Sequence, residues 1–208
     1  MAARLPAGRL PAGRLPAARL PADRRRRQLL DVALDVFAGR GFHGTSMDDL
    51  AEAAGVSKPV LYQHFASKRG LYQELLDDVR ERLVEAVTKA TAEASGPRQQ
   101  VTAGFEAYFG FVAEHESAFR FLFGGGEGRE PEFADAVREA EDTMAAAVAP
   151  LIQADIDDDH RRLLAYGIVG LAEAASRWWV LGGREEDPAV LGRRIADLAW
   201  AGLRGVHR

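Results

Sequence analysis

Apolar residues recur at helical spacing along almost the whole chain. From Arg24 onward leucine, valine, alanine and phenylalanine return at intervals of three and four, and no segment alternates clearly between apolar and polar residues. Glycine, proline and serine interrupt this pattern often enough to divide it into separate helices. The sequence therefore predicts an all-α protein of about nine helices.

The interruptions set the bounds of the expected helices. The first is expected from Arg24 to about Arg40, the second from Thr45 or Ser46 to Gly55, and the third directly after Ser57. Later helices are expected at about 68–94, 99–114, 119–123, 131–155, 158–181 and 188–207. Residues 24–68 are predicted to form a three-helix domain, and residues 69–208 a second helical domain.

Positive charge is concentrated at the amino-terminal end. The formal net charge is -4, but residues 1–68 contain eleven Lys and Arg against six Asp and Glu, a balance of +5 that leaves -9 for the rest. An acidic protein with a basic first third is suited to meet a polyanion through that third.

The first 23 residues repeat a pentamer. Arg-Leu-Pro-Ala begins at Arg4, Arg9, Arg14 and Arg19. Proline at every fifth position prevents a continuous helix, and one leucine per unit offers too little apolar surface to offset the ordering entropy, so 1–23 is expected to be a disordered arm. Two interpretations stay open: the arm and the following basic run contact nucleic acid, or the repeat has no binding role.

Residues 58–65 form a short predicted helix with two different sides. Leu61 and Phe65 lie one turn apart and are expected to pack into the core of the three-helix domain. Lys58, Pro59 and Tyr62 fall on the opposite side, and the preceding segment 51–56 has the small residue and glycine of a helix-turn-helix bend. A short helix held from behind with a polar front suits the major groove of DNA.

A longer stretch carries a family resemblance. The segment from Arg27 to Lys68, which contains LLDVALDVFAGRGFHGTSMDDLAEAAGVSKPVLYQHFASK, resembles the DNA-binding domain of the tetracycline-repressor (TetR) family of bacterial transcription regulators. The positions in register are Phe37, Gly41, Phe42, Thr45, Ser46, Leu50, Ala51, Ala54, Gly55, Val56, Ser57, Leu61, Tyr62, His64, Phe65, Ser67 and Lys68. The resemblance covers about a fifth of the chain.

The resemblance implies a function and assigns roles to residues. Proteins of that family are homodimers whose third helix reads bases, and they are usually repressors released from a palindromic operator by a small ligand. The base-facing role falls on Lys58, Pro59, Val60 and Tyr62. The phosphate-facing role falls on Thr45, Ser46, His64 and Lys68, and the basic run 24–27 adds Arg27.

The last two expected helices are candidates for a homodimer interface. One helix-turn-helix reads only a few base pairs, so specific binding generally needs two copies. Helices 158–181 and 188–207 carry stripes of small and apolar residues that permit close approach. The stripes comprise Leu163, Tyr166, Gly167, Gly170, Leu171, Ala174, Leu191, Ile195, Leu198, Gly202 and Leu203. The alternative is that both helices only complete the core of one subunit.

The middle of the chain is rich in aromatic residues, which suits a pocket for an unknown hydrophobic or planar small-molecule effector. The candidate lining residues are Phe105, Tyr108, Phe109, Phe123, Met144 and Trp178. The alternative is that most of these rings belong to the core.

Other classes of protein fit less well. The chain has no cysteine, no HExxH and no GxSxG, and the glycines at 124–128 lack the Lys-Ser/Thr of a phosphate loop. The acidic cluster at 157–159 with His160 precedes a helix, where carboxylates favour the helix dipole. We therefore expect no enzyme, no metal and no cofactor, and, since no run of eighteen apolar residues occurs, a cytoplasmic protein without a membrane span. A helical adaptor that binds only protein is the remaining alternative.

Overall fold

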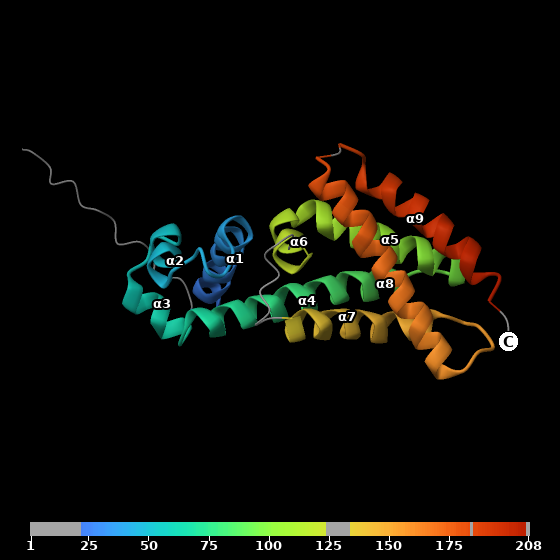
Figure 1. Ribbon diagram of the computed structural model, residues 1–208, viewed down its shortest axis with the longest axis horizontal. Coiled ribbons are helices and arrows are strands. Elements are labelled where there is room, and N and C mark those ends of the chain that lie inside the picture. The colour runs from blue at the N-terminus through green and yellow to red at the C-terminus, as the bar shows by residue number, and fades with distance from the viewer. Residues whose placement is uncertain (1–21, 124–133, 184, 207–208) are drawn as a thin grey trace, which may run out of the picture.

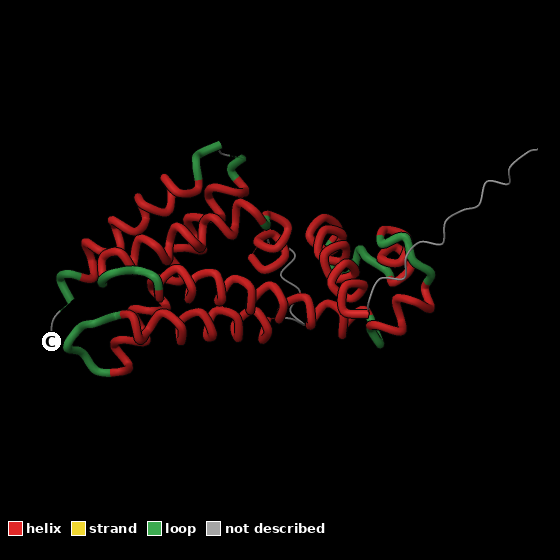
Figure 2. The backbone as a smooth tube through the Cα atoms, turned by 180° about the vertical axis from the view of Figure 1, so that it is seen from behind, coloured by secondary structure: helices red, strands yellow, loops and turns green. Residues whose placement is uncertain are grey.

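The computed structural model describes residues 22–123, 134–183 and 185–206, except for the side chains of residues 122, 123, 136 and 137. These residues form nine α-helices and a single 3-10 turn, and no strand occurs among them (Figures 1 and 2). The all-α prediction is confirmed. The predicted arm lies outside the described residues except for Ala22 and Asp23, which begin the first helix.

Three short elements form a unit at one end of the molecule (Figure 1). They are α1 (Ala22–Arg40), α2 (Met47–Ala53) and α3 (Lys58–His64). Glycine makes both turns between them possible, because Gly41 and Gly55 have φ values of 71° and 63°, a conformation that side chains with a Cβ disfavour.

The longest helix, α4 (Lys68–Ala92), leads from this unit into the rest of the molecule (Figure 1). Ser67 caps its start by accepting a hydrogen bond from the amide of Gly70 at 3.0 Å. With 25 residues the helix is about 37 Å long. It therefore has one end beside α3 and the other among the helices of the second unit.

The second unit consists of α5 (Pro97–Glu114), α6 (Glu116–Phe123), α7 (Ala134–Val148), α8 (Asp158–Leu181) and α9 (Pro188–Leu203). Helix α5 packs between α4 and α9, and α7 packs against α4 and α8. The approach of α9 to α5 is especially close, since a Cβ added at Gly192 would lie 3.0 Å from the Cα of Glu106. None of the described helices combines the length and apolar character that a membrane span requires.

One buried apolar cluster extends through both units. Helix α6 joins them, because it packs on α1 and places the Phe121 ring 6.3 Å from Phe37 and 4.6 Å from Tyr72, measured between ring centroids. The three-helix unit is therefore packed directly on the second unit as well as being linked to it by α4.

Two expected helix bounds were wrong because of proline. Helix α5 begins at Pro97 and not at residue 99, since proline is well tolerated in the first turn, where its missing amide costs no hydrogen bond. The helix expected to run to residue 155 ends at Val148 and is followed by the 3-10 turn Ala149–Leu151. Pro150 explains this end, because it has no amide to continue the α-helical ladder.

Candidate DNA-binding surface and ligand cavity

Helix α3 is held from one side and exposed on the other. Leu61 and Phe65 are buried against the three-helix core with 1% and 3% of their surface exposed. Lys58, Pro59 and Tyr62 are exposed on the outer side, and Tyr62 keeps 44% of its surface accessible. Val60, the fourth residue predicted to face bases, is half-buried. The outer side thus presents a cation, a phenol and an apolar ring to whatever docks there.

Lys58 is paired within the protein. Its Nζ lies 2.9 Å from the carboxylate of Asp48 on α2, and both side chains are at least half exposed. The hydrogen bond with Asp48 is the main reason that the pKa of Lys58 is raised, so the side chain stays charged at neutral pH. The sequence did not identify Asp48 as the partner of Lys58, because ten residues separate them. Only the turn between α2 and α3 brings them together.

The two hydroxyl residues before α2 behave differently. Ser46 is exposed and forms a capping box: its Oγ accepts from the Asp49 amide at 3.1 Å, while the Asp49 carboxylate accepts from the Ser46 amide at 2.8 Å. Thr45 is buried, and its hydroxyl donates to the Gly41 carbonyl at 2.8 Å. The Thr45 side chain therefore stabilises the α1–α2 turn, and its phosphate contact stays a prediction.

Lys68 is also engaged inside the protein. Its Nζ donates to the carbonyls of Phe42 and Thr45, each at 2.8 Å, and lies 4.2 Å from the centre of the Phe42 ring. The ammonium thus fastens the start of α4 to the α1–α2 turn. In this structure Lys68 therefore acts as a positioning residue, and its phosphate contact stays a prediction.

Arginines of the basic run connect α1 to the elements around it. Arg27 is paired with Asp78 on α4, and this hydrogen bond raises the pKa of Arg27. Arg26 donates to the His64 carbonyl at 2.6 Å, is paired with Glu74 and lies 4.6 Å from the centre of the Phe65 ring. Arg26 therefore fixes the end of α3, a role that nothing in the run of four arginines indicated.

The residues predicted to contact DNA share one part of the surface. Open hollowed surface between α2 and α3 is bordered by residues of both groups, among them Thr45, Ser46, Lys58, Tyr62 and Lys68. Pro59, Val60, His64 and Arg27 do not border it. The structure thus brings together two of the four residues predicted to face bases and three of the five predicted to face phosphates.

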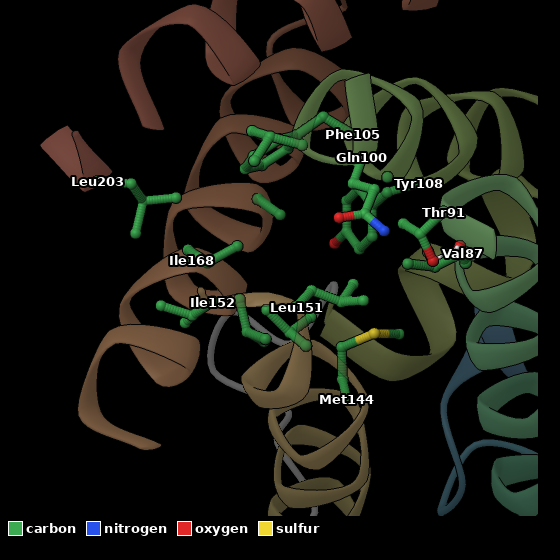
Figure 3. Close-up of a pocket in the computed structure, with 15 residues that line it drawn as sticks. Val87, Thr91, Gln100, Phe105, Tyr108, Met144, Leu151, Ile152, Ile168 and Leu203 are labelled. Atoms are coloured by element: carbon green, nitrogen blue, oxygen red, sulfur yellow. Dashed lines mark hydrogen bonds between the residues drawn. The ribbon is translucent and has the colours of Figure 1, made fainter. Parts of the chain in front are cut away.

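An apolar cavity lies within the second unit, between α4, α5, α7, α8 and α9 (Figure 3). It offers a volume of about 80 Å³ to the centres of water-sized molecules. The lining residues are Val87, Thr91, Gln100, Val101, Gly104, Phe105, Tyr108, Met144, Val148, Leu151, Ile152, Ile168, Val169, Ala172 and Leu203. Aliphatic side chains form most of this wall, and the polar ends of Gln100 and Tyr108 point into the space (Figure 3).

Three of the six predicted pocket residues line this cavity: Phe105, Tyr108 and Met144. Phe109 is fully buried beside it, with its ring 6.4 Å from that of Trp179. Trp178 lies on the outer face of α8 with 51% of its surface exposed, because it is one position away from the buried Trp179 on the helix. The side chain of Phe123 lies outside the described residues.

The acidic cluster before α8 has a structural role. Asp157 is the N-cap, and its carboxylate accepts from the His160 amide at 2.8 Å. Among the residues that the structure describes, no group of three or more histidines and carboxylates is arranged to hold a metal ion.

Helices α8 and α9 expose apolar residues. Leu163 and Leu198 have 67% and 60% of their surface exposed, and a Cβ at Gly167, Gly170 or Gly202 would meet no atom within 4 Å. The packing of one subunit therefore does not require small residues at these positions. Two residues of α9 that were expected in the exposed stripe face the interior of the subunit. Leu191 is buried, and Leu203 lines the cavity.

Comparison with known proteins places both units in one family. Residues 29–75 match the family described as bacterial regulatory proteins, tetR family, and residues 97–202 match the tetracyclin repressor-like C-terminal domain. The chain belongs to the TetR family. As a TetR-family member it is a helix-turn-helix transcriptional regulator and not an enzyme.

Individual relatives agree with this assignment. The chain is 38% identical over 188 residues to the HTH-type transcriptional activator FasR of Mycolicibacterium smegmatis, covering 88% of this chain and 85% of FasR. A solved TetR-like transcriptional regulator from Rhodococcus sp. RHA1 has a TM-score of 0.74 at 34% identity, covering 90% of this chain and all of that one. FadR from Bacillus subtilis, solved in complex with stearoyl-CoA, has the same fold, with a TM-score of 0.73 at 17% identity over 87% of this chain and 99% of FadR.

Proposed function

We propose that this TetR-family regulator is a homodimer that binds a palindromic DNA operator through α3 and is controlled by an apolar small molecule in the cavity of the second unit. The observation that carries the proposal is the exposed side of α3, where Lys58, Pro59 and Tyr62 face outward while Leu61 and Phe65 hold the helix from behind. We place this activity in the cytoplasm, where bacterial DNA lies.

The charge of the α3 surface supports base contact. Lysine is a donor for guanine O6 and N7 in the major groove, and Pro59 and Val60 offer apolar surface for a thymine methyl group. The pairing of Lys58 with Asp48 holds the ammonium at the amino end of α3. On DNA, guanine or phosphate oxygens would replace the carboxylate as partners of Lys58.

The exposed face of α8 and α9 supports the homodimer. Exposing large apolar side chains to water at 60% or more of their surface is unfavourable, and a dimer would bury them. The nearby glycines let two helix pairs approach closely. A two-fold axis through this face would present two copies of α3 to half-sites about 34 to 36 Å apart.

The cavity supports control by a ligand. Its wall is almost entirely aliphatic and aromatic, so it favours an apolar molecule. The stearoyl chain of the ligand named for the FadR structure is an example of such an apolar group. Helix α4 extends from the cavity residues Val87 and Thr91 to the end of α3 in the DNA-binding unit.

Footprinting on DNA flanking the gene for this protein tests the DNA-binding proposal. We expect a protected palindrome at moderate salt, with protection lost on adding an apolar effector. Glu substitutions at both Leu163 and Leu198 are expected to give monomers in sedimentation and to abolish the footprint. Glu93→Gln, at the exposed residue that follows α4, serves as the control. Binding to all duplexes alike would contradict the proposal.

A reporter gene behind the protected site measures the direction of regulation. The sequence-based expectation is repression, so reporter activity should rise when the regulator is deleted. FasR is named an activator, and a fall in reporter activity on deletion would assign this chain the same direction.

A further inference from the structure

The cavity wall contains few polar groups. Thr91, Gln100 and Tyr108 are the lining residues with polar side chains, and no lining residue carries a charge. The Thr91 hydroxyl is occupied, because it lies 3.0 Å from the carbonyls of both Val87 and Thr88. Gln100 and Tyr108 therefore supply the polar atoms that remain for a ligand.

Both of these groups are buried without a partner. Among the described residues, Gln100 Oε1 and the Tyr108 hydroxyl accept or donate no hydrogen bond of good geometry. Ser176 on α8 is completely buried beside Tyr108, and its hydroxyl lowers the pKa of the phenol against the rise from burial, but the two hydroxyls form no hydrogen bond of good geometry. Since a buried polar group without a hydrogen-bond partner is unfavourable, the unpaired atoms of Gln100 and Tyr108 in one cavity wall point to a partner that enters the cavity.

Tyr108 acts as a hydrogen-bond donor in this setting. Burial is the main cause that raises the pKa of Tyr108, so its phenol keeps the proton at neutral pH. The phenol therefore has a proton to donate, and an acceptor atom on a ligand would take it. Gln100 lies two turns earlier on α5, on the same side of that helix, and it offers an amide oxygen that needs a donor.

A charged ligand group is disfavoured at this place. No cation lines the cavity itself. The small hollow that shares Tyr108, Met144 and Val169 with it is bordered by one cation, Arg80, and by two carboxylates, Glu141 and Glu173. A carboxylate placed there would lose its hydration with no positive partner in the wall, which is costly in an apolar environment. An uncharged oxygen gains the Tyr108 bond without this penalty.

We propose that the cavity takes a molecule with an apolar body and one uncharged oxygen, a hydroxyl or an ester-type carbonyl, that accepts a hydrogen bond from Tyr108. A hydroxyl would also donate to Gln100 Oε1, whereas a carbonyl would not. This inference rests on the proposed function, because it assigns the chemistry of the ligand at the effector site.

Calorimetric titration of the full-length protein with three octyl compounds tests the inference. We expect 1-octanol and methyl octanoate to bind at least tenfold more tightly than octanoate at neutral pH. Tyr108→Phe is expected to weaken the alcohol and the ester about 5- to 10-fold, the effect of one net hydrogen bond. Gln100→Met is expected to weaken the alcohol and to leave the ester almost unchanged, so it separates the two sources of the oxygen.

The fold is checked separately from the ligand. Tyr108→Phe removes an unpaired hydroxyl, so its thermal unfolding midpoint should equal or exceed that of the unchanged protein. If Tyr108→Phe does not fold, Gln100→Met tests the inference instead. A lower affinity for the alcohol with an unchanged affinity for the ester supports it, and equal changes contradict it. Octanoate binding as tightly as the neutral compounds, or affinities unchanged in both variants, would overturn this inference alone. If none of the three compounds binds, both this inference and the proposed ligand control are wrong.

Discussion

The DNA-binding surface and the ligand cavity treat their polar side chains in opposite ways. On the surface, Lys58 is bonded to Asp48, Ser46 to Asp49, and Lys68 to two carbonyls. In the cavity, Gln100 and Tyr108 have no partner in the described part of the chain. The internal partners fix the positions of the surface side chains before DNA binds. On DNA, an exposed carboxylate or water can be exchanged for a phosphate or a base. The cavity wall has no internal partner to exchange for these atoms, so they limit which molecule can occupy it.

Truncating a buried side chain beside the cavity should lower the free energy of unfolding more than truncating a side chain on the DNA-binding surface. Phe109→Ala is expected to lower the free energy of unfolding by about 3 to 5 kcal/mol, since Phe109 has no exposed surface and its loss would leave a second hole next to the existing one. Urea denaturation measures this change. Tyr62→Ala on the DNA-binding surface is the matched aromatic control and should leave the urea midpoint unchanged. A loss below 1 kcal/mol in Phe109→Ala would mean that this core is loosely packed.

Lys68→Met is expected to cost about 1.5 to 3 kcal/mol of stability, because it removes a charged donor from the carbonyls of Phe42 and Thr45. Thermal or urea unfolding reports this directly. The phosphate-facing role that the family resemblance implies for Lys68 predicts instead a uniform weakening of binding to all DNA. An unchanged unfolding midpoint together with a reduced salt dependence of DNA binding would restore that first interpretation.

Lys58→Met is expected to reduce the preference for the operator over random DNA about tenfold to 100-fold, with no change in unfolding. Competition gel-shift assays measure the preference. Asp48→Asn is the control, since it weakens the internal partner of Lys58 and keeps the cation, so operator preference should persist. Equal weakening on operator and random DNA would assign Lys58 to the phosphates.

Ser46→Ala should have the smallest effect, about 1 kcal/mol from loss of the α2 cap. Hydrogen bonds from Ser46 are the main cause that lowers the pKa of Asp49. A lowered carboxyl pKa stabilises the fold above the unfolded pKa of about 3.8, and this contribution is lost as the pH falls through the folded value. The stability difference between Ser46→Ala and the unchanged protein should therefore shrink between pH 5 and pH 3. A difference that is constant over this range would show that the Asp49 carboxylate takes no part in the cap.

The sequence predicted the DNA-binding unit far better than the cavity, for a physical reason. Ser46, Gly41 and Gly55 act on residues within one turn of themselves, so caps and turns can be inferred from local spacing. The cavity collects residues from five helices, and aliphatic residues such as Ile152 and Ile168 have the same spacing as ordinary core residues. Aromatic composition therefore identified Phe105 and Tyr108 but also selected Trp178, which faces outward.

The close contact between Gly192 and Glu106 couples α9, a helix of the proposed dimer interface, to α5, which lines the cavity. Phe105 lines the cavity, and its backbone lies 3.2 Å from where a Cβ of Gly192 would be. No side chain separates the two helices at this point. If a bulky ligand moved α5 outward, α9 would therefore move with it. In the proposed homodimer, the size of the bound ligand would then alter the spacing of the two subunits.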